Sequence, residues 1–213
     1  MKIALFGASG MIGQRVLKEA VSRGHEVTAI VRDPSKITEK GPKVHAVKGD
    51  VLNTADVAKL VAGHDAVISA YSPMSTGSPD ALLTATRSLI AGMKQAGVKR
   101  LIAVGGAGGL EVAPGKKVID LPDFPAAWKG IAQAHIDALK VYETEAGTLD
   151  WTNLSPAAMI EPGQRTGQFR TADNQLIADS AGNSKISAED YAIALLNELE
   201  KPTHIKKRFT VGY

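Results

Sequence analysis

Short apolar runs alternate with longer amphipathic stretches along this chain, and glycines separate many of them. Runs of strand length occur at residues 2–6, 25–31, 43–48, 66–70, 100–104, 150–155, 174–179 and 208–211. The stretches between them repeat apolar residues at intervals of three and four, which is the spacing of one helix face. This alternation predicts an α/β fold, with a doubly wound, mostly parallel sheet and helices on both of its faces.

Start and stop signals place five helices in the amphipathic stretches. Gly24 closes the first helix, and Gly97 stops the third. The other signals are Asn53 or Thr54 as cap of a helix over 55–62, Ser78-Pro79-Asp80 with a hydroxyl cap, Phe124-Pro125 opening a helix to about Ala146, and Ser187 before 188–200. No repeat, low-complexity tract or linker interrupts the pattern, so residues 1–213 are expected to form a single domain.

The first thirteen residues, MKIALFGASGMIG, combine a strand, a glycine-rich turn and the start of a helix. The positive dipole end and unpaired N–H groups of that helix favour an anion such as a pyrophosphate. Gly7 is expected to take a positive φ, Gly10 to leave room for a ligand, and Gly13 to let helix and strand pack closely. The spacing is not the G-x-G-x-x-G of the dinucleotide fingerprint, but the next strand completes a βαβ unit. A dinucleotide site is predicted, with a turn that binds nothing as the alternative.

The second strand ends in VRDPSKI, where a doubly wound sheet meets the adenosine ribose of a bound dinucleotide. An acidic residue there binds the 2′-hydroxyl of NAD, whereas an arginine accommodates the 2′-phosphate of NADP. Val31 is followed by Arg32, with Lys36 close by, so NADP is favoured over NAD. Asp33 is the competing group, because it either turns toward the ribose or begins the turn before Pro34.

Polar and small residues follow the next two strands. Asp50 comes after the third strand, where its carboxylate is expected to accept from an adenine amino group while the Val51 backbone donates. The fourth strand ends in Ser69-Ala70-Tyr71, and small residues there allow ribose and pyrophosphate to cross the sheet at its switch point. Tyr71 and the loop Ser72 to Ser78 are expected to border the site.

Two later segments are candidates for the acceptor side of this site. The glycine run 105–109 is either a close backbone approach beneath the nicotinamide or a flexible connection into a long loop through Asp123. Residues of about 156–186 leave the sixth strand as irregular, polar chain and are expected to form substrate-side loops. Within them, Arg165 either faces the pocket and attracts anionic substrates or forms an ion pair with Glu161 or Asp173.

Composition narrows the possible partners. The 25 basic and 22 acidic residues give a net charge of +3, and no long basic run predicts a nucleic-acid partner; Lys206 to Arg208 is interpreted as a solvated strand edge. The absence of cysteine excludes disulfides, a thiolate nucleophile and cysteine metal sites, and no metal site is predicted. Apolar stretches fall short of the roughly 18 residues of a membrane span, and glycines interrupt the first one, unlike a secretory signal. A soluble cytoplasmic protein is expected.

Taken together, these motifs resemble the atypical short-chain dehydrogenase/reductase group, and within it the small NADH-flavin reductases, which are related to biliverdin reductase B and the NmrA-like regulators. The stretch LDWTNLSPAAMIEPGQRTGQFR is the most particular part of the resemblance. The resemblance implies a Rossmann sheet of strand order 3-2-1-4-5-6 or a close variant, with NADP or NAD along its carboxyl edge. It implies cofactor contacts from Gly7, Ala8, Ser9, Gly10, Met11, Ile12, Gly13, Arg32, Asp50, Val51, Ser69, Ala70, Tyr71, Val104, Gly105, Gly106, Ser155, Pro156 and Ala157.

The chain departs from the wider superfamily at the proton donor. That superfamily uses a serine after the fifth strand and Tyr-x-x-x-Lys on the next helix, where the lysine lowers the tyrosine pKa. Here Gly105-Gly106 takes the serine region, and Tyr142 is followed four residues later by Ala146. The catalytic candidates that remain, each with a structural role as the alternative, are Trp128, Lys129, His135 and Arg165.

Two functions of different classes fit these features. The first is an NAD(P)H-dependent reductase of a small flat or carbonyl-bearing molecule, because hydride transfer to a flavin needs orientation and a dry pocket more than a strong protein acid. The second is a dinucleotide-sensing regulator of NmrA type, which binds the cofactor without turnover. In either case the sequence predicts a small-molecule ligand and a monomer or small homo-oligomer.

Overall fold

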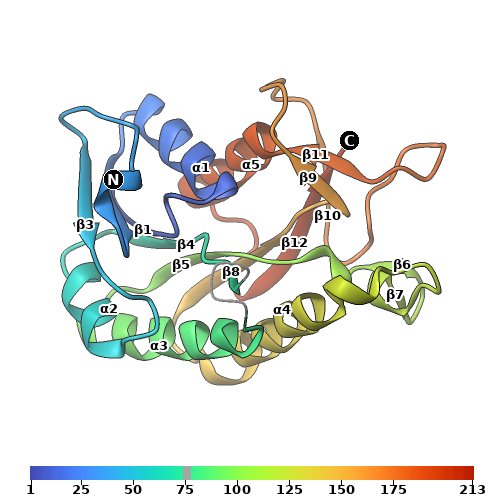
Figure 1. Ribbon diagram of the computed structural model, residues 1–213, viewed down its shortest axis with the longest axis horizontal. Coiled ribbons are helices and arrows are strands. Elements are labelled where there is room, and N and C mark those ends of the chain that lie inside the picture. Colours follow the sequence, from blue (N-terminus) through green and yellow to red (C-terminus); the bar gives the residue numbers. More distant parts are fainter. Residues whose placement is uncertain (74–77) are drawn as a thin grey trace.

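The computed structural model describes residues 1–73 and 78–213, so residues 74–77 of the loop expected to border the site lie outside the described residues. Its central sheet consists of β1 (Lys2–Phe6), β2 (Glu26–Val31), β3 (Val44–Lys48), β4 (Ala66–Ser69), β5 (Arg100–Val104), β8 (Asp150–Ser155), β10 (Arg170–Ala172) and β12 (Lys207–Gly212). The helices are α1 (Met11–Ser22), α2 (Thr54–Val61), α3 (Asp80–Ala96), α4 (Ala126–Glu145) and α5 (Ala188–Glu200). Helices α1 and α5 cover one face of the sheet, and α2, α3 and α4 cover the other (Figure 1).

The strand order is β10-β12-β8-β5-β4-β1-β2-β3. All neighbouring strands are parallel except β10 and β12, which form an antiparallel pair at one edge. The six strands from β8 to β3 therefore have the doubly wound order that the resemblance implied, and the predicted fold class is confirmed. In the described part of the chain, no helix combines the length and the apolar character needed to cross a membrane.

The hydrophobic core has two halves, one on each face of the sheet. Along β1, Ile3 and Leu5 pack with α1 and α5, whereas Ala4 and Phe6 pack on the opposite side with α2 and α3. This alternation follows from the two-residue period of a strand, and both faces are apolar because helices cover both. The helices on both faces hold the sheet so that the carboxyl ends of its parallel strands lie beside the helix N-termini.

Most helix signals act as the sequence predicted. The Asn53 side chain caps α2 by accepting from Ala55 N at 2.9 Å and Asp56 N at 3.1 Å. Gly97 ends α3 with a φ of 72°, and Ser187 caps α5. The predicted hydroxyl cap of α3 is wrong, because its N-cap residue is Pro79 and no side chain caps it.

Two predictions about irregular segments are corrected. The expected strand at 174–179 is instead extended chain with one isolated bridge at Gln175, and the edge strand is β10. Ile177 in this run is buried because it packs against Gly212 at the end of β12. This packing explains the apolar side chain and does not need backbone hydrogen bonds to a neighbouring strand. The long loop predicted after the glycine run holds a small hairpin of β6 (Glu111–Ala113) and β7 (Lys116–Lys117). A further short pair joins β9 (Met159–Glu161) to β11 (Lys185–Ser187).

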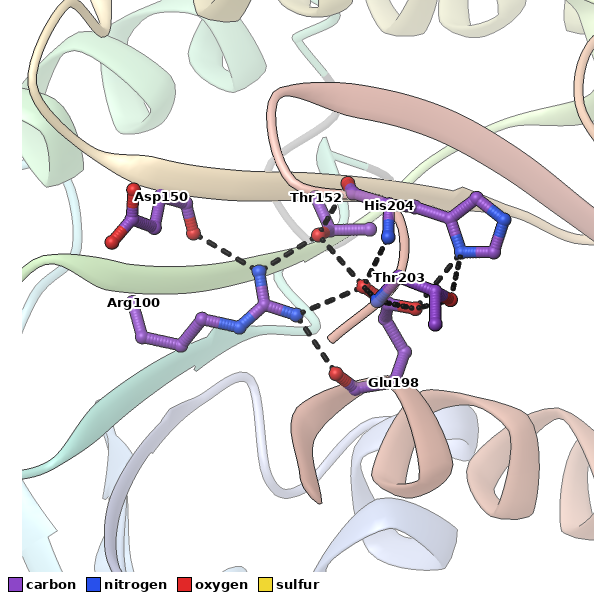
Figure 2. A network of polar contacts seen from close by, with 6 residues as sticks. All are labelled: Arg100, Asp150, Thr152, Glu198, Thr203 and His204. Carbon is purple, nitrogen blue, oxygen red and sulfur yellow. Dashed lines mark hydrogen bonds and ion pairs between the residues drawn. The ribbon is translucent and has the colours of Figure 1, made fainter. Parts of the chain in front are cut away.

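A buried polar network closes the amino edge of the sheet, far from the helix N-termini (Figure 2). Arg100, at the start of β5, donates to Thr152 Oγ1 at 2.7 Å and to the backbone oxygen of Glu198 at 3.0 Å. The Glu198 carboxylate also accepts from Thr203 and His204 in the connection to β12. Burial by itself would raise the pKa of Glu198, but the hydrogen bonds from His204 and Thr203 outweigh it and lower the pKa. We interpret this edge as structural.

Candidate functional site

The glycine turn between β1 and α1 has the backbone geometry that the sequence predicted. Gly7 has a φ of 77°, and a Cβ at this position would lie 2.5 Å from the carbonyl oxygen of Ala70. A Cβ on Gly13 would lie 2.8 Å from the carbonyl carbon of Gly7, so both glycines are required for packing. A Cβ on Gly10 would make only an ordinary contact, 3.4 Å from the carbonyl oxygen of Gly7, and Gly10 is exposed beside a cleft.

Among the described residues, no side chain neutralises the positive N-terminus of α1. Gly10 is the N-cap, no side chain caps the helix, and no acidic residue lies in its first turn. The first N–H groups and the positive end of the helix dipole therefore face the open space beside Gly10. A phosphate group fits this arrangement, because it supplies both acceptor oxygens and negative charge.

A cleft extends from this turn across the carboxyl ends of β1, β2, β3 and β4. It is lined by Gly7, Ser9 and Gly10 from the turn, by Arg32, Asp50 and Val51 opposite, and by Ala70 and Tyr71 at the switch point. The exposed Arg32 side chain forms neither an ion pair nor a hydrogen bond within the described residues. One free cation thus faces the same cleft as the open helix end.

Asp33 does not compete for this cleft. Its carboxylate accepts from the Ser35 hydroxyl at 2.7 Å and from the Ser35 backbone at 3.1 Å, which lowers the pKa of Asp33. Asp33 thereby begins the turn through Pro34, and that alternative is confirmed. Lys36 is exposed in the same turn but is not among the residues that line the cleft.

The Asp50 carboxylate is only partly available to a ligand. One of its carboxylate oxygens accepts from Leu52 N at 3.0 Å, in a local turn before α2. The other oxygen has no partner within the described residues, and Asp50 and Val51 both line the cleft. A single carboxylate oxygen is therefore available to a ligand.

The part of this sheet edge that was expected to lie beside the reacting substrate is built from the ends of β5 and β8. The Gly105 N–H donates to Leu154 O at 2.7 Å, and a Cβ on Gly105 would collide with the side-chain oxygen of Asn153. A Cβ on Gly106 would lie 2.9 Å from the imidazole of His135 on α4. The glycine run packs closely against these side chains and continues into a short 3-10 helix over Ala107–Gly109, and its approach to the nicotinamide stays a prediction.

Unpaired polar groups gather at this end of the sheet. The buried Ser155 hydroxyl has no hydrogen-bond partner within the described residues, and the same holds for the buried Tyr71 hydroxyl. Ser155 is followed by Pro156 and Ala157, both buried. Asn153 was not among the residues predicted from the sequence. An amide side chain between Thr152 and Leu154, inside a strand that is buried, is unusual and could have indicated it. Buried polar groups without partners are typical of a functional site.

Trp128 and Lys129 lie in the first turn of α4 and are both exposed. The Trp128 side chain is 59% exposed, so it is not part of the core. Next to it, a Cβ on Gly130 would touch Pro79, at the start of α3. The start of α4 therefore packs against the start of α3 at Gly130 and Pro79.

Arg165 is not in the wall of an acceptor pocket, and this expectation is corrected. It forms a two-pronged ion pair with Glu19 on α1, with both N–O distances 2.9 Å. The hydrogen bond from Arg165 lowers the pKa of Glu19, against the opposing effect of burial and with help from Arg23. Arg165 therefore forms an ion pair, as one alternative predicted, but its partner is Glu19 rather than Glu161 or Asp173. A hollow of about 390 Å³ beside this pair runs along the outer face of α1.

The rest of the segment expected to form substrate-side loops is anchored to α5. Asp190 accepts from Thr166 N and Gly167 N, each at 2.8 Å, and from the Tyr213 hydroxyl at 2.8 Å. Glu189 accepts from Gly163 N at 2.7 Å. Residues 163–167 are therefore fixed over the N-terminus of α5 and along α1.

A glycine turn at an open helix end, at the switch point of a doubly wound sheet, defines a dinucleotide-binding protein. The chain belongs to the NAD(P)H-binding family, whose model matches residues 7–202. A nicotinamide dinucleotide is the cofactor of that family, and the cleft beside Gly10 has room for its phosphates.

Solved structures of similar chains agree on the fold but carry different names. The putative exported protein of Burkholderia pseudomallei is 48% identical, with 100% of both chains covered and a TM-score of 0.91. A putative epimerase of Bacteroides thetaiotaomicron is 42% identical over 100% of this chain and 96% of its own, with a TM-score of 0.91. A putative NADH-flavin reductase of Streptococcus pneumoniae is 37% identical over 100% and 99%, with a TM-score of 0.83.

Proposed function

We propose that this protein is an NAD(P)H-dependent reductase that transfers a hydride to a small flat or carbonyl-bearing acceptor, such as a flavin or a quinone. The observation that carries the proposal is the cleft that joins the N-terminus of α1, which no side chain caps, to Arg32, which has no partner within the described residues. At the same edge of the sheet, the Ser155 hydroxyl at the end of β8 is buried without a partner in the described part of the chain. The resemblance to the NADH-flavin reductase of Streptococcus pneumoniae supports the acceptor class.

We further propose NADP as the preferred cofactor. The turn from Gly7 to Gly13 holds the pyrophosphate with the N–H groups of the first turn of α1, since the Gly10 N–H donates to Gly7 O. Arg32 holds the 2′-phosphate, and Asp50 with Val51 meets the adenine. Lys36 adds positive charge near the phosphate without lining the cleft. Val104 to Gly106 and Ser155 to Ala157 form the floor beneath the nicotinamide.

The bound cofactor supplies a hydride, and the protein positions the acceptor against it. The overall reaction consumes NAD(P)H, the acceptor and one proton, and it yields NAD(P)⁺ and the acceptor reduced by two electrons. No Tyr-x-x-x-Lys pair supplies that proton, since Ala146 stands four residues after Tyr142 and burial raises the pKa of Tyr142 to about 12. Exposed Trp128 offers a ring face against which a flat acceptor can stack.

The missing acid also favours a second function, a regulator that binds the cofactor without turnover. Anchored residues 163–167 and the exposed Trp128 would then present a surface whose shape reports cofactor binding. The two functions differ in one measurable property, because only the reductase consumes NADPH.

The test is NADPH oxidation by the purified protein with riboflavin, FMN, a naphthoquinone and biliverdin as acceptors. We expect oxidation with at least one of them. Gly10→Val is the matched control, because its backbone angles, φ −76° and ψ 169°, suit any residue and its side chain would fill only the open space. This variant should keep its melting temperature and lose NADPH oxidation. Tight NADPH binding without oxidation of any acceptor would refute the reductase and leave the regulator.

A further inference from the structure

Next to the proposed nicotinamide floor, two uncharged polar side chains have no hydrogen-bond partner in residues 1–73 and 78–213. Asn153 comes from the middle of β8, and His135 comes from the facing side of α4. They meet the two consecutive glycines that follow β5, Asn153 beneath Gly105 and His135 against Gly106. Three elements far apart in sequence thus bring an amide and an imidazole to the same two-residue segment at the end of β5.

Asn153 is the less expected of the two. Its side chain is only 4% exposed, yet neither its amide oxygen nor its amide nitrogen forms a hydrogen bond within the described residues. The neighbouring Thr152 is equally buried but fully paired, with Arg100 and with His204 O. An amide without a protein partner is available to a ligand, because its two donors and its acceptor oxygen are not used within the described residues.

His135 has the complementary chemistry. Its ring is half-buried against Gly106 and has no hydrogen-bond partner within the described residues. Burial lowers the pKa of His135 to about 4, so the imidazole is neutral near pH 7. A neutral imidazole offers one N–H donor and one acceptor, and an amide offers two donors and an acceptor oxygen.

We propose that Asn153 and His135 are specificity-determining residues that recognise the carbonyl end of an uncharged acceptor; this inference rests on the proposed reductase function. Donors on both side chains suit a carbonyl oxygen, and their hydrogen bonds strengthen as that oxygen gains negative charge when the hydride arrives. The pair carries no cation, so a carboxylate at the same place would be desolvated without compensation. The pair therefore selects quinones and the uncharged ring of a flavin over α-keto acids. The proton that completes the reduction comes from solvent.

The test compares two neighbours on β8 that differ in pairing. Asn153→Leu keeps the number and branching of the side-chain heavy atoms but replaces the amide by two larger methyl groups, so the melting temperature should change little. The KM for a naphthoquinone should rise at least tenfold, while the Kd for NADPH changes less than twofold. Thr152→Val is the control, because its hydroxyl is paired away from the site. Here the melting temperature should fall by several degrees with KM unchanged.

A second variant and a binding measurement separate this inference from the proposed function. His135→Phe keeps a ring of similar size against Gly106 and should raise the naphthoquinone KM in the same way. Riboflavin binding to the NADP⁺ complex, followed by fluorescence, should weaken at least tenfold in both variants even if no turnover occurs. An active wild-type enzyme whose KM and riboflavin affinity survive Asn153→Leu would overturn the inference alone. Absence of riboflavin binding to the wild-type complex would overturn it too.

Discussion

Helices α1 and α5 lie side by side on one face of the sheet, and both begin at the carboxyl edge of the sheet (Figure 1). Their N-termini nevertheless differ in how their positive charge is satisfied. The first turn of α5 holds two carboxylates of its own, Glu189 and Asp190, and Ser187 caps it. The first turn of α1 has neither an acid nor a side-chain cap. One positive helix end is neutralised by the protein, and the other is left for a ligand.

Two arginines show the same contrast. Arg165, near α5, is held by both oxygens of Glu19, whereas Arg32, in the cleft beside α1, has no partner within the described residues. The comparison shows that a helix end or a cation indicates a binding site only when the protein has left it unsatisfied. Around α5, the helix end and the charged side chains are satisfied by the protein, and they hold residues 163–167 in place.

The largest effect is expected from breaking the closed end of α5. Asp190→Ala removes the carboxylate that holds Thr166, Gly167 and Tyr213, and should lower the free energy of unfolding by about 3 kcal/mol, as for other buried charged hydrogen bonds. Denaturant unfolding measures this loss. Tyr213→Phe removes one of these bonds and should cost about 1 kcal/mol. Equal stability of Asp190→Ala and the wild type would show that α5 is not closed by this residue.

The same carboxylate predicts a pH dependence. Burial would raise the pKa of Asp190, but the hydrogen bonds from Thr166, Gly167 and Tyr213 lower it below its ordinary value of 3.8. A group with a depressed folded-state pKa stabilises the protein above its unfolded pKa, and this contribution is lost as the pH falls through the folded value. Acid unfolding of Asp190→Ala should therefore be less steep below about pH 4 than that of the wild type.

The free arginine beside α1 gives the next effect. Arg32→Ala should remove most of the preference for NADPH over NADH, about 1–3 kcal/mol for a charge-assisted contact. Calorimetric titration with both cofactors measures it, and the melting temperature should not change because Arg32 has no internal partner within the described residues. If the unmutated protein binds NADPH and NADH equally, the assignment of Arg32 is wrong.

Closing the open end of α1 is the reciprocal experiment. Met11 is 38% exposed at the start of α1, so Met11→Glu would place a carboxylate where α5 has its own acids. Repulsion from the pyrophosphate should weaken NADPH binding about tenfold, while the free protein gains about 0.3–1 kcal/mol from the helix dipole. Met11→Gln is the uncharged control and should leave both quantities close to wild type. A Met11→Glu protein with full NADPH affinity would place the phosphates elsewhere.

The smallest effect is expected at the paired arginine. Arg165→Met keeps the apolar stem and deletes the charge, and the Arg165 side chain is 58% exposed. Its ion pair should therefore contribute about 1 kcal/mol or less, and Glu19 keeps its bond to Arg23 at 2.8 Å. Turnover and NADPH affinity should stay unchanged. A tenfold loss of turnover with an anionic acceptor, at constant melting temperature, would return Arg165 to the substrate site.

The sequence predicted the parts of this molecule that depend on neighbouring residues. Gly7, Gly97 and Ser187 mark a turn, a helix end and a cap through their own backbone freedom or hydroxyl group. Apolar period and length placed the central strands, and the confirmed fold class followed from their alternation with helices. The extended run at 174–179 failed the same test, because an apolar residue there is buried by packing rather than by a strand ladder.

Tertiary structure decided which polar groups are already satisfied. Glu19 is 146 positions away from Arg165, so no local pattern could distinguish it from Glu161 or Asp173 as the partner. Asn153 became a candidate only when the fold placed it beneath Gly105 with no hydrogen-bond partner among the described residues. Residue type and spacing give the number of donors and acceptors in each segment, but their pairing depends on chains that meet in space. At this sheet edge, the residues that we assign to ligands include Arg32, Asn153 and Ser155, whose polar groups have no partner within the described residues.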